Sequence, residues 1–113
     1  MHLGIDLGTS AVKVVLTADD GALLDQASAA VATHHPRPLY SEQHPRDWWD
    51  ATTAALGELR TRHDLRRVRG IGLSGQMHGA VLLDAADRVL RPAILWNDGR
   101  CLAAQRIGDH ARG

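Results

Sequence analysis

The sequence contains no phenylalanine, and aromatic residues make up only 4% of its 113 residues. A hydrophobic core must therefore be built mainly from valine, leucine, isoleucine and alanine, which suits one modest domain at this length. No apolar run approaches the roughly 20 residues that span a bilayer, and the N-terminus shows no basic-then-apolar signal pattern. The single cysteine, Cys101, excludes an internal disulfide and is typical of a reducing compartment. We expect a cytoplasmic protein.

An excess of charge of either sign is also missing. Thirteen lysines and arginines balance 13 aspartates and glutamates, so the formal net charge is +0. Such a balance gives no electrostatic footprint for nucleic acid or for an anionic membrane. Arginines gather between residues 60 and 69, but no aromatic residue interleaves them, which indicates a solvated face. We expect neither a nucleic-acid partner nor a membrane partner.

What is present centres on the stretch G-I-D-L-G-T-S-A-V-K-V-V, residues 4–15. Apolar residues alternate with others up to residue 7, which predicts a strand. The next three residues predict a turn, and the β-branched run from Val12 predicts a second strand. Successive backbone N–H groups in such a turn can bind an anion, and neighbouring hydroxyl and ammonium groups add donors. The residues expected to hold a phosphate are Gly8, Thr9, Ser10 and Lys13.

One carboxylate, Asp6, ends the first predicted strand. Beside a phosphate it would repel the anion unless a cation lay between them. Mg²⁺ is suited to this position, because it binds through one or two carboxylates, phosphate oxygens and several waters. The stretch therefore indicates a site for a Mg²⁺–nucleotide complex. A plain β-hairpin in which Asp6 helps to cap the turn explains the same residues.

The rest of the chain predicts a mixed α/β order. Asp19-Asp20-Gly21 is a hairpin signal, and an Ala-rich strand, at an edge or half-exposed, is expected over residues 22–32. Prolines predict an irregular loop over residues 34–45, and Pro45 suits the first turn of a helix that runs to about residue 63. Further elements are expected over 68–74, 81–83 and 89–95 as strands, and over 102–112 as a helix.

Two apolar stripes are expected on the helix over 45–63. One contains Trp49, Thr53 and Leu56, and the other contains Trp48, Ala51, Ala55 and Leu59. Both tryptophans are interpreted as core and loop packing, because buried aromatics are more often structural than ligand-binding. Stacking of Trp48 or Trp49 on a ligand is the alternative.

The segment Gln76-Met77-His78 follows the strand expected over 68–74. The letters G-x-G-x-x-G at residues 70–75 do not indicate a dinucleotide site, because these glycines lie inside a predicted strand instead of opening a helix. The carboxyl end of such a strand is where α/β sheets bind ligands. Gln76 and His78 offer donors and acceptors for sugar hydroxyls, and Met77 offers an adaptable apolar wall. A histidine satisfied within a loop is the alternative.

Four motifs carry a resemblance to a known family. D-L-G-T-S with V-K-V resembles the first phosphate motif of the superfamily of sugar kinases, hexokinase, actin and heat-shock ATPases. S-E-Q-H-P-R-D-W-W, G-L-S-G-Q-M-H-G and R-P-A-I-L-W-N-D-G-R resemble the FGGY carbohydrate kinases, and the xylulose kinases among them most closely. The motifs recur in family order from residue 2 to residue 100. Glycerol kinases of the same family carry a different dipeptide in place of Met77-His78.

The resemblance implies a fold and a domain organisation. The fold class expected is α/β, a ribonuclease H-like half-domain of the actin-like ATPase superfamily, with a mixed sheet that opens with three antiparallel strands. Residues 1–113 would be the sugar-binding side of an N-terminal kinase domain, with a hairpin insertion after the fourth strand. A C-terminal ATP-binding sister domain is expected as partner. Formation of a homodimer is left open as an alternative. A metal-dependent nuclease of the same fold would need further acidic residues near Asp6. The end of the fourth strand offers Ser74 instead of an acid, which argues against a nuclease.

The resemblance also implies a reaction, the ATP-dependent phosphorylation of D-xylulose or a related ketose with Mg²⁺. Asp6 would orient waters on Mg²⁺ as the catalytic residue of this chain, while the catalytic base would lie beyond residue 113. The chain alone is therefore expected to be inactive, and a non-catalytic sugar- or nucleotide-binding domain is the alternative. Asn97 and Asp98 are expected either to bind the sugar or to fold their turn. The expected sugar ligands are Gln76, Met77, His78, Asn97 and Asp98.

Overall fold

The computed structural model describes residues 1–101, and the chain divides into two compact parts. We call residues 1–32 and 45–76 the sheet unit, and residues 33–44 with those from 77 onward the polar unit. The helix expected over 102–112 lies outside the described residues. Within residues 1–101 no helix is both long enough and apolar enough to cross a membrane.

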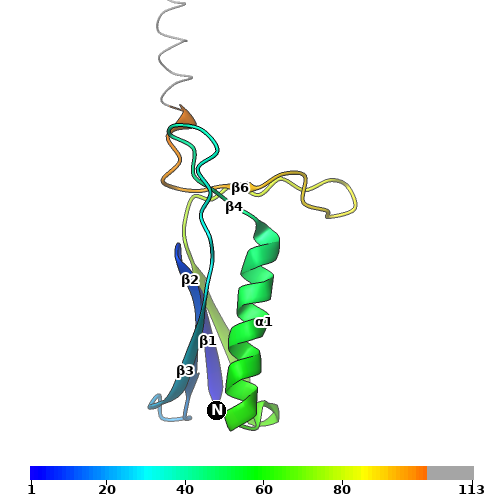
Figure 1. Ribbon diagram of the computed structural model, residues 1–113. Helices are drawn as coiled ribbons and strands as arrows, with labels where there is room; N and C mark the ends of the chain where they lie inside the picture. The colour runs from blue at the N-terminus through cyan, green and yellow to red at the C-terminus, as the bar shows by residue number, and fades with distance from the viewer. Residues whose placement is uncertain (102–113) are drawn as a thin grey trace, which may run out of the picture. The chain divides into compact units, whose positions relative to one another are not determined.

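The sheet unit contains a four-stranded mixed sheet in the order β3-β2-β1-β5. β1 pairs antiparallel with β2 and parallel with β5, and β2 pairs antiparallel with β3. A parallel pair requires a crossover connection, and helix α1 lies on the connection that leads to β5 (Figure 1). The bounds are His2–Leu7 (β1), Ala11–Thr17 (β2), Leu23–Ala30 (β3), Pro45–Arg62 (α1), Leu65–Arg67 (the 3₁₀ helix η1) and Gly70–Gly75 (β5).

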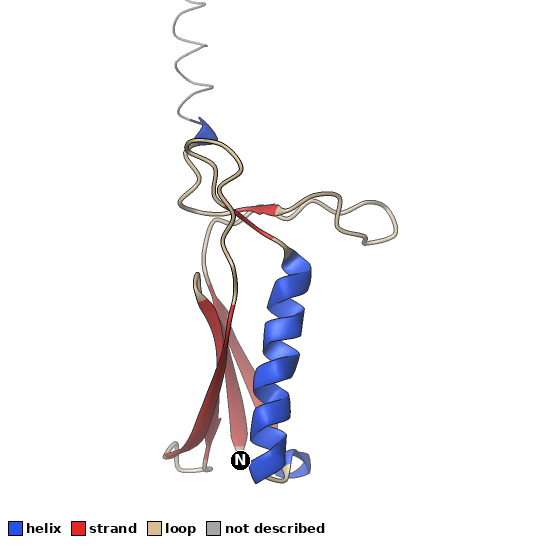
Figure 2. Ribbon diagram, in the orientation of Figure 1, coloured by secondary structure: helices blue, strands red, loops and turns tan. Residues whose placement is uncertain are grey.

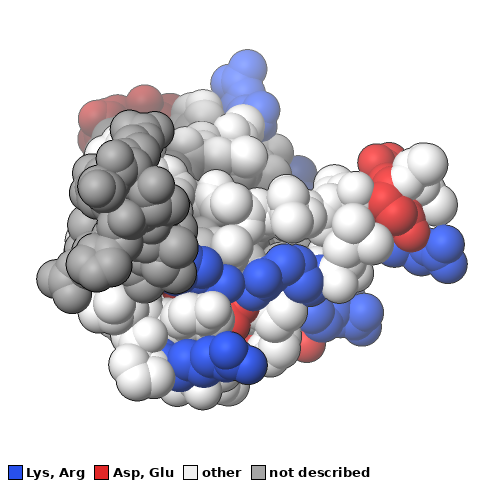
Figure 3. Space-filling model, turned by 90° about the horizontal axis from the view of Figure 1, so that it is seen from above, with Lys and Arg blue, Asp and Glu red and all other residues white. Residues whose placement is uncertain are grey.

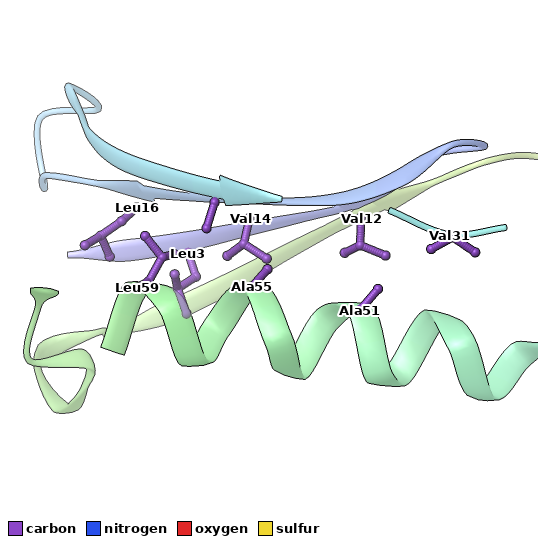
Figure 4. Close-up of a cluster of buried hydrophobic side chains, with 9 residues drawn as sticks. Leu3, Val12, Val14, Leu16, Val31, Ala51, Ala55 and Leu59 are labelled. Atoms are coloured by element: carbon purple, nitrogen blue, oxygen red, sulfur yellow. The ribbon is translucent and has the colours of Figure 1, made fainter. Parts of the chain in front are cut away.

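The core of the sheet unit lies between the sheet and α1. Leu16 from β2 and Leu59 from α1 are both fully buried, and Figure 4 shows them in one apolar layer. The helix predicted from Pro45 is confirmed, and its stripe with Ala51, Ala55 and Leu59 is the buried one. The labelled members of this cluster in Figure 4 are Leu3, Val12, Val14, Leu16, Val31, Ala51, Ala55 and Leu59.

The two neighbouring tryptophans of α1 have different surroundings. Trp48 packs against the core cluster, as predicted. Trp49 is 66% exposed, so its predicted role in core packing is wrong. The reason is geometric: successive helix positions are turned by about 100°, and the face with Ala51 and Ala55 already contacts the sheet.

The two edges of the sheet are built differently. β3 is an edge strand, as predicted, and Asp25 on it contacts the end of α1: its Oδ2 lies 2.8 Å from Arg62 Nε and 2.8 Å from His63 Nε2. β5 forms the other edge, where Ile71 is 60% and Leu73 is 79% exposed. Both edges carry exposed apolar side chains, since Leu23 and Leu24 of β3 are 60% and 47% exposed, but β3 is also anchored by ionic contacts to the end of α1.

The polar unit contains a two-stranded antiparallel pair, β4 (Glu42–Gln43) with β6 (Ala93–Ile94) (Figure 2). The prediction of an irregular loop over 34–45 is wrong at β4. His34 and Glu42 also bridge through reciprocal backbone hydrogen bonds of 2.8 and 2.9 Å. The prolines at 36 and 38 lie between these bonded residues, so their missing N–H groups cost no pairing.

The strands predicted over 81–83 and 89–95 form only in part. Between them the structure has one isolated bridge, Leu83 with Val89, besides β6. The apolar side chains of residues 81–83 and 89–90 are exposed, so no packed face holds these arms as a regular hairpin, whereas Ala93 and Leu95 are buried where β6 forms. At its tip Asp84 and Arg88 form an ion pair of 2.8 Å, and Figure 3 shows acidic and basic side chains side by side there.

Candidate functional site

Asp6 lies near the carboxyl end of β1, between two polar partners. In the register of the sheet it pairs with Lys13 on β2 and with Ser74 on β5. Side chains alternate along a strand, so Asp6 lies on the face opposite to buried Leu3, and it is exposed. One acidic, one basic and one hydroxyl side chain therefore share the face of the sheet that α1 does not cover.

A hollow of about 370 Å³ opens on this face. Gly4 and Gly72 are register partners in its lining and have no side chain to fill it. A Cβ added at Gly4 would lie 2.9 Å from Val15 Cγ2, whereas one added at Gly72 would meet nothing within 4 Å. Gly72 thus leaves room on this face for a ligand group, while the space at Gly4 is taken by the Val15 side chain. The lining residues are Gly4, Ile5, Asp6, Lys13, Val15, Gly72, Leu73 and Ser74.

The turn Gly8-Thr9-Ser10 connects β1 to β2 and is fixed by backbone hydrogen bonds. The Gly8 N–H donates to the Ala11 carbonyl at 3.0 Å, and the Ser10 carbonyl accepts from the Val31 N–H at 2.9 Å. A Cβ added at Gly8 would lie 2.9 Å from the Ala11 carbonyl oxygen, so only glycine fits there without a backbone shift. The Gly8 N–H is therefore engaged in a hydrogen bond within the turn, in place of the expected contact with a phosphate.

Asp6 is the carboxylate available to a metal at this end of the sheet. Among residues 1–101 no group of three or more histidine, cysteine, aspartate or glutamate side chains is arranged to hold a metal ion. Mg²⁺ commonly keeps several waters and takes one or two carboxylates plus substrate phosphates. The donor set at Asp6 therefore fits a metal that arrives with a nucleotide, and it does not fit a metal held by protein ligands alone.

The three residues expected to contact a sugar follow β5 directly. The Gln76 N–H donates to the Leu7 carbonyl at 2.8 Å, which extends the β1–β5 pairing by one residue. Met77 and His78 begin the polar unit; Met77 is 72% exposed, and His78 has a φ of 60°. Positive φ is uncommon outside glycine, and backbone strain of this kind clusters at binding sites. Among the described residues Leu39 (φ 70°) and Asp87 (φ 61°) share this conformation, so what distinguishes His78 is its place directly after β5.

Asn97 lies in the middle of a four-residue turn over 95–98. The Asp98 N–H donates to the Leu95 carbonyl at 3.1 Å and closes the turn. Leu95 is buried, while the two central residues, Trp96 and Asn97, are exposed. The turn therefore presents two side chains from an anchored backbone.

Asp98 has a different environment from Asn97. Its side chain is 2% exposed, and its oxygens accept hydrogen bonds from Arg100 Nη2 (2.7 Å), Arg100 Nε (2.8 Å) and the Ser41 N–H (2.7 Å). The guanidinium of Arg100 lowers the pKa of the Asp98 carboxyl far below its ordinary value, although burial acts in the opposite direction. Of the two roles expected for Asp98, these contacts favour folding of the turn.

Sequence reasoning gave no role to four residues of the network that includes Asp98. They are Tyr40, Glu42, Arg91 and Arg100. Arg100 Nη2 lies 3.6 Å from Glu42 Oε2, and Arg91 pairs with the same carboxylate. The Arg100 guanidinium carbon lies 3.8 Å from the centroid of the Tyr40 ring. One signal for these ion pairs is present in the sequence: one family-like motif contains the acidic Glu42, and another contains the basic Arg91 and Arg100.

Comparisons with known proteins match nearly the whole chain to one family. The sequence profile of the FGGY family of carbohydrate kinases, N-terminal domain, matches residues 1–108. The xylulose kinase of Escherichia coli K12 is 54% identical over 101 residues, a match that covers 89% of this chain and 21% of that protein. The fold of this chain is similar to that of a xyloylose kinase from Brucella ovis, with a TM-score of 0.88 and 47% identity over 97% of this chain and 24% of that one.

A further solved structure, the xylulose kinase from Rhodospirillum rubrum, has a TM-score of 0.83 and 33% identity over 95% of this chain and 23% of that one. The chain thus spans between a fifth and a quarter of the length of these relatives. The family profile covers nearly all of the chain, and the relatives match its sequence and its fold together. The chain therefore belongs to the FGGY family of carbohydrate kinases.

Proposed function

We propose that these residues form part of a kinase that transfers the γ-phosphoryl group of ATP to D-xylulose, giving D-xylulose 5-phosphate. The observation that carries the proposal is the exposed pair Met77-His78 after β5, in a chain 54% identical to a xylulose kinase. An imidazole and a thioether suit the hydroxyls and the carbon skeleton of a ketose. The activity is proposed for a protein of the relatives' length, since this chain spans 21% of that relative.

The phosphate side of the site is proposed to lie at the turn after β1. The hydroxyls of Thr9 and Ser10 would donate to phosphate oxygens, and Lys13 would add a positive charge from β2. Gly8 would contribute mainly through its small size, because its N–H bonds to Ala11 within the turn. The hollow beside Asp6 supports this assignment, since it offers space next to both charged side chains.

Asp6 is proposed as the residue that orients Mg²⁺ through bound water. When bound, Mg²⁺ would neutralise charge that develops on the transferred phosphoryl group. Asp6 would hold its position through the β1 backbone, which is paired on both sides, and Lys13 opposite it would balance part of its charge. A nuclease of related fold would need more carboxylates here, and the register partners Lys13 and Ser74 argue against that.

The sugar is proposed to contact Gln76, Met77, His78 and Asn97. Gln76 and Asn97 carry amides, which both donate and accept hydrogen bonds, and Asn97 stands exposed in its turn. The strand order β3-β2-β1-β5 supports a ribonuclease H-like half-domain of the actin-like ATPase superfamily. A second domain that closes on the ligands would exclude water from the reacting groups, and it would supply the catalytic base. We therefore propose weak sugar binding and no turnover for the 113 residues alone.

The test is a titration of the purified chain with D-xylulose, followed by NMR. His78→Ala is expected to weaken binding by about 1–3 kcal/mol, because it leaves polar groups of the complex unpaired. His2→Ala removes a histidine of the sheet unit and serves as the matched control, with unchanged affinity expected. The proposed sugar contact fails if His78→Ala binds D-xylulose as well as the unmodified chain does. Turnover of ATP with D-xylulose by the unaided chain would instead overturn the proposed inactivity of these 113 residues.

A further inference from the structure

The carboxylate of Asp98 is fully engaged within the polar unit. Besides the Arg100 side chain and the Ser41 N–H, it accepts a hydrogen bond from the Arg100 N–H at 3.0 Å. Four hydrogen bonds occupy about four lone-pair sites, on a side chain that is 2% exposed. A sugar hydroxyl could bind Asp98 only by displacing one of these donors. The Asp98 carboxylate therefore stabilises the fold of the polar unit, and these contacts favour that role over binding of the sugar.

Arg100 is the centre of this arrangement. Its guanidinium binds Asp98 through two nitrogens, approaches Glu42 to 3.6 Å and lies over Tyr40 at 3.8 Å. Its side chain is 18% exposed. Only a planar guanidinium group can make a bidentate contact with a carboxylate and stack on a ring at the same time, so lysine cannot replace Arg100. Arg91 also pairs with Glu42. The two guanidinium groups of Arg91 and Arg100 therefore balance the charges of the two carboxylates, Glu42 and Asp98.

The backbone around the turn is anchored to one neighbouring segment. The Leu95 N–H donates to the Ser41 carbonyl at 3.0 Å, and the Gly99 N–H donates to the Leu39 carbonyl at 2.6 Å. These bonds lie on either side of residues 96–98, and Asp98 adds a third contact through the Ser41 N–H. The backbone that carries Asn97 is therefore held by contacts on both sides of it.

We propose that Arg100 is a positioning residue for the sugar site: it fixes Asp98 and Glu42, and thereby sets the turn that presents Asn97. This inference rests on the proposed function, because Asn97 is a sugar contact only there. Asp98 and Glu42 belong to the same positioning device, and Tyr40 supports its guanidinium. The predicted consequence is that a change at Arg100 lowers sugar affinity without removing any atom that touches the sugar.

The test is a double-mutant cycle on the 113-residue chain, with D-xylulose affinity measured by NMR. Arg100→Lys and Asn97→Ala are each expected to weaken binding about tenfold, and the double variant no more than about twofold beyond Asn97→Ala, since coupled residues are not additive. Arg88→Lys is the matched control: Arg88 pairs with Asp84 in the same unit but is 80% exposed, so unchanged affinity is expected. Losses that multiply, or an Arg100→Lys chain that binds normally, would overturn the proposal.

A measurement without sugar separates this inference from the proposed function. In Arg100→Lys the backbone amides of Trp96 and Asn97 should show lower NMR order parameters than in the unmodified chain, because order parameters report fast local motion. If the unmodified chain binds no D-xylulose, the proposed function fails. If these order parameters are unchanged, the positioning role fails. Tyr40→Leu, which keeps both ion pairs, replaces Arg100→Lys if that variant does not fold, and a smaller change in the same direction is expected.

Discussion

The sheet unit and the polar unit are held together by different forces. Nine buried apolar residues form the core of the sheet unit, between the sheet and α1. In the polar unit, Ala93 and Leu95 are the buried apolar residues among those described, while Glu42, Gln43 and Ser41 are buried polar ones. Apolar burial is non-directional, whereas ion pairs and hydrogen bonds require defined geometry. The comparison teaches that stability resides mainly in one unit and positional precision in the other.

The difference fits the chemistry proposed for each unit. The sheet unit carries Asp6, Lys13 and the turn after β1, for which a rigid strand pair supplies the geometry. The polar unit carries Met77, His78 and Asn97, whose backbones lie outside regular elements. Loops on a scaffold commonly carry binding residues. A network around Arg100 can replace the missing core by fixing such a loop.

The largest effect is expected from a cavity in the sheet unit. Leu59→Ala removes a side chain that is fully buried against β2 and should lower the free energy of unfolding by about 2–5 kcal/mol. Urea denaturation followed by circular dichroism measures it. Leu24→Ala is the matched control, because Leu24 is 47% exposed. Equal losses in the two variants would contradict the view that this core carries the stability.

An intermediate effect is expected from acid. Asp98 has a lowered pKa in the folded chain because of Arg100, and Asp25 has one because of Arg62 and His63. A carboxyl whose pKa falls on folding stabilises fully above its unfolded pKa, about 3.9, and this contribution is lost as the pH falls below that value. Amide exchange should show the polar unit losing protection before the core strands. An Asp98→Asn chain with an unchanged acid profile would be evidence against this.

The smallest effect is expected from Trp49→Ala. Trp49 is 66% exposed, so the free energy of unfolding should change by no more than about 0.5 kcal/mol. Trp48→Ala, one residue earlier, removes contacts with the core cluster and should cost clearly more. Urea denaturation of the pair measures the contrast. A larger loss for Trp49→Ala would mean that this face of α1 is covered in solution.

The sheet unit was more predictable from sequence than the polar unit, for physical reasons. The strands around the first turn and the helix from Pro45 show regular periodicities and clear turn signals, which reflect burial of one face. The exposure of Trp49 could not be read from its stripe, because periodicity does not say which of two stripes faces the sheet.

The polar unit has little periodicity, since few of its side chains are buried together. Its contacts join residues far apart in sequence, such as Ser41 with Asp98 and Glu42 with Arg91. Local propensity does not encode such pairs. The strands expected over 81–83 and 89–95 form only in part for a related reason: an apolar run predicts a regular strand only where a second layer covers it, and residues 81–83 and 89–90 are exposed. The roles of Asp6, His78 and Asn97 stay predictions.

The most direct test of the division between the units is a pair of NMR titrations of the labelled chain, one with D-xylulose and one with Mg²⁺–ATP. The sugar is expected to shift the signals of Met77, His78 and Asn97, and the nucleotide those of residues 6–13. Asp6→Asn should weaken the nucleotide response and leave the sugar response intact. Sugar-induced shifts confined to residues 6–13, or the absence of any shift with either ligand, would contradict the account.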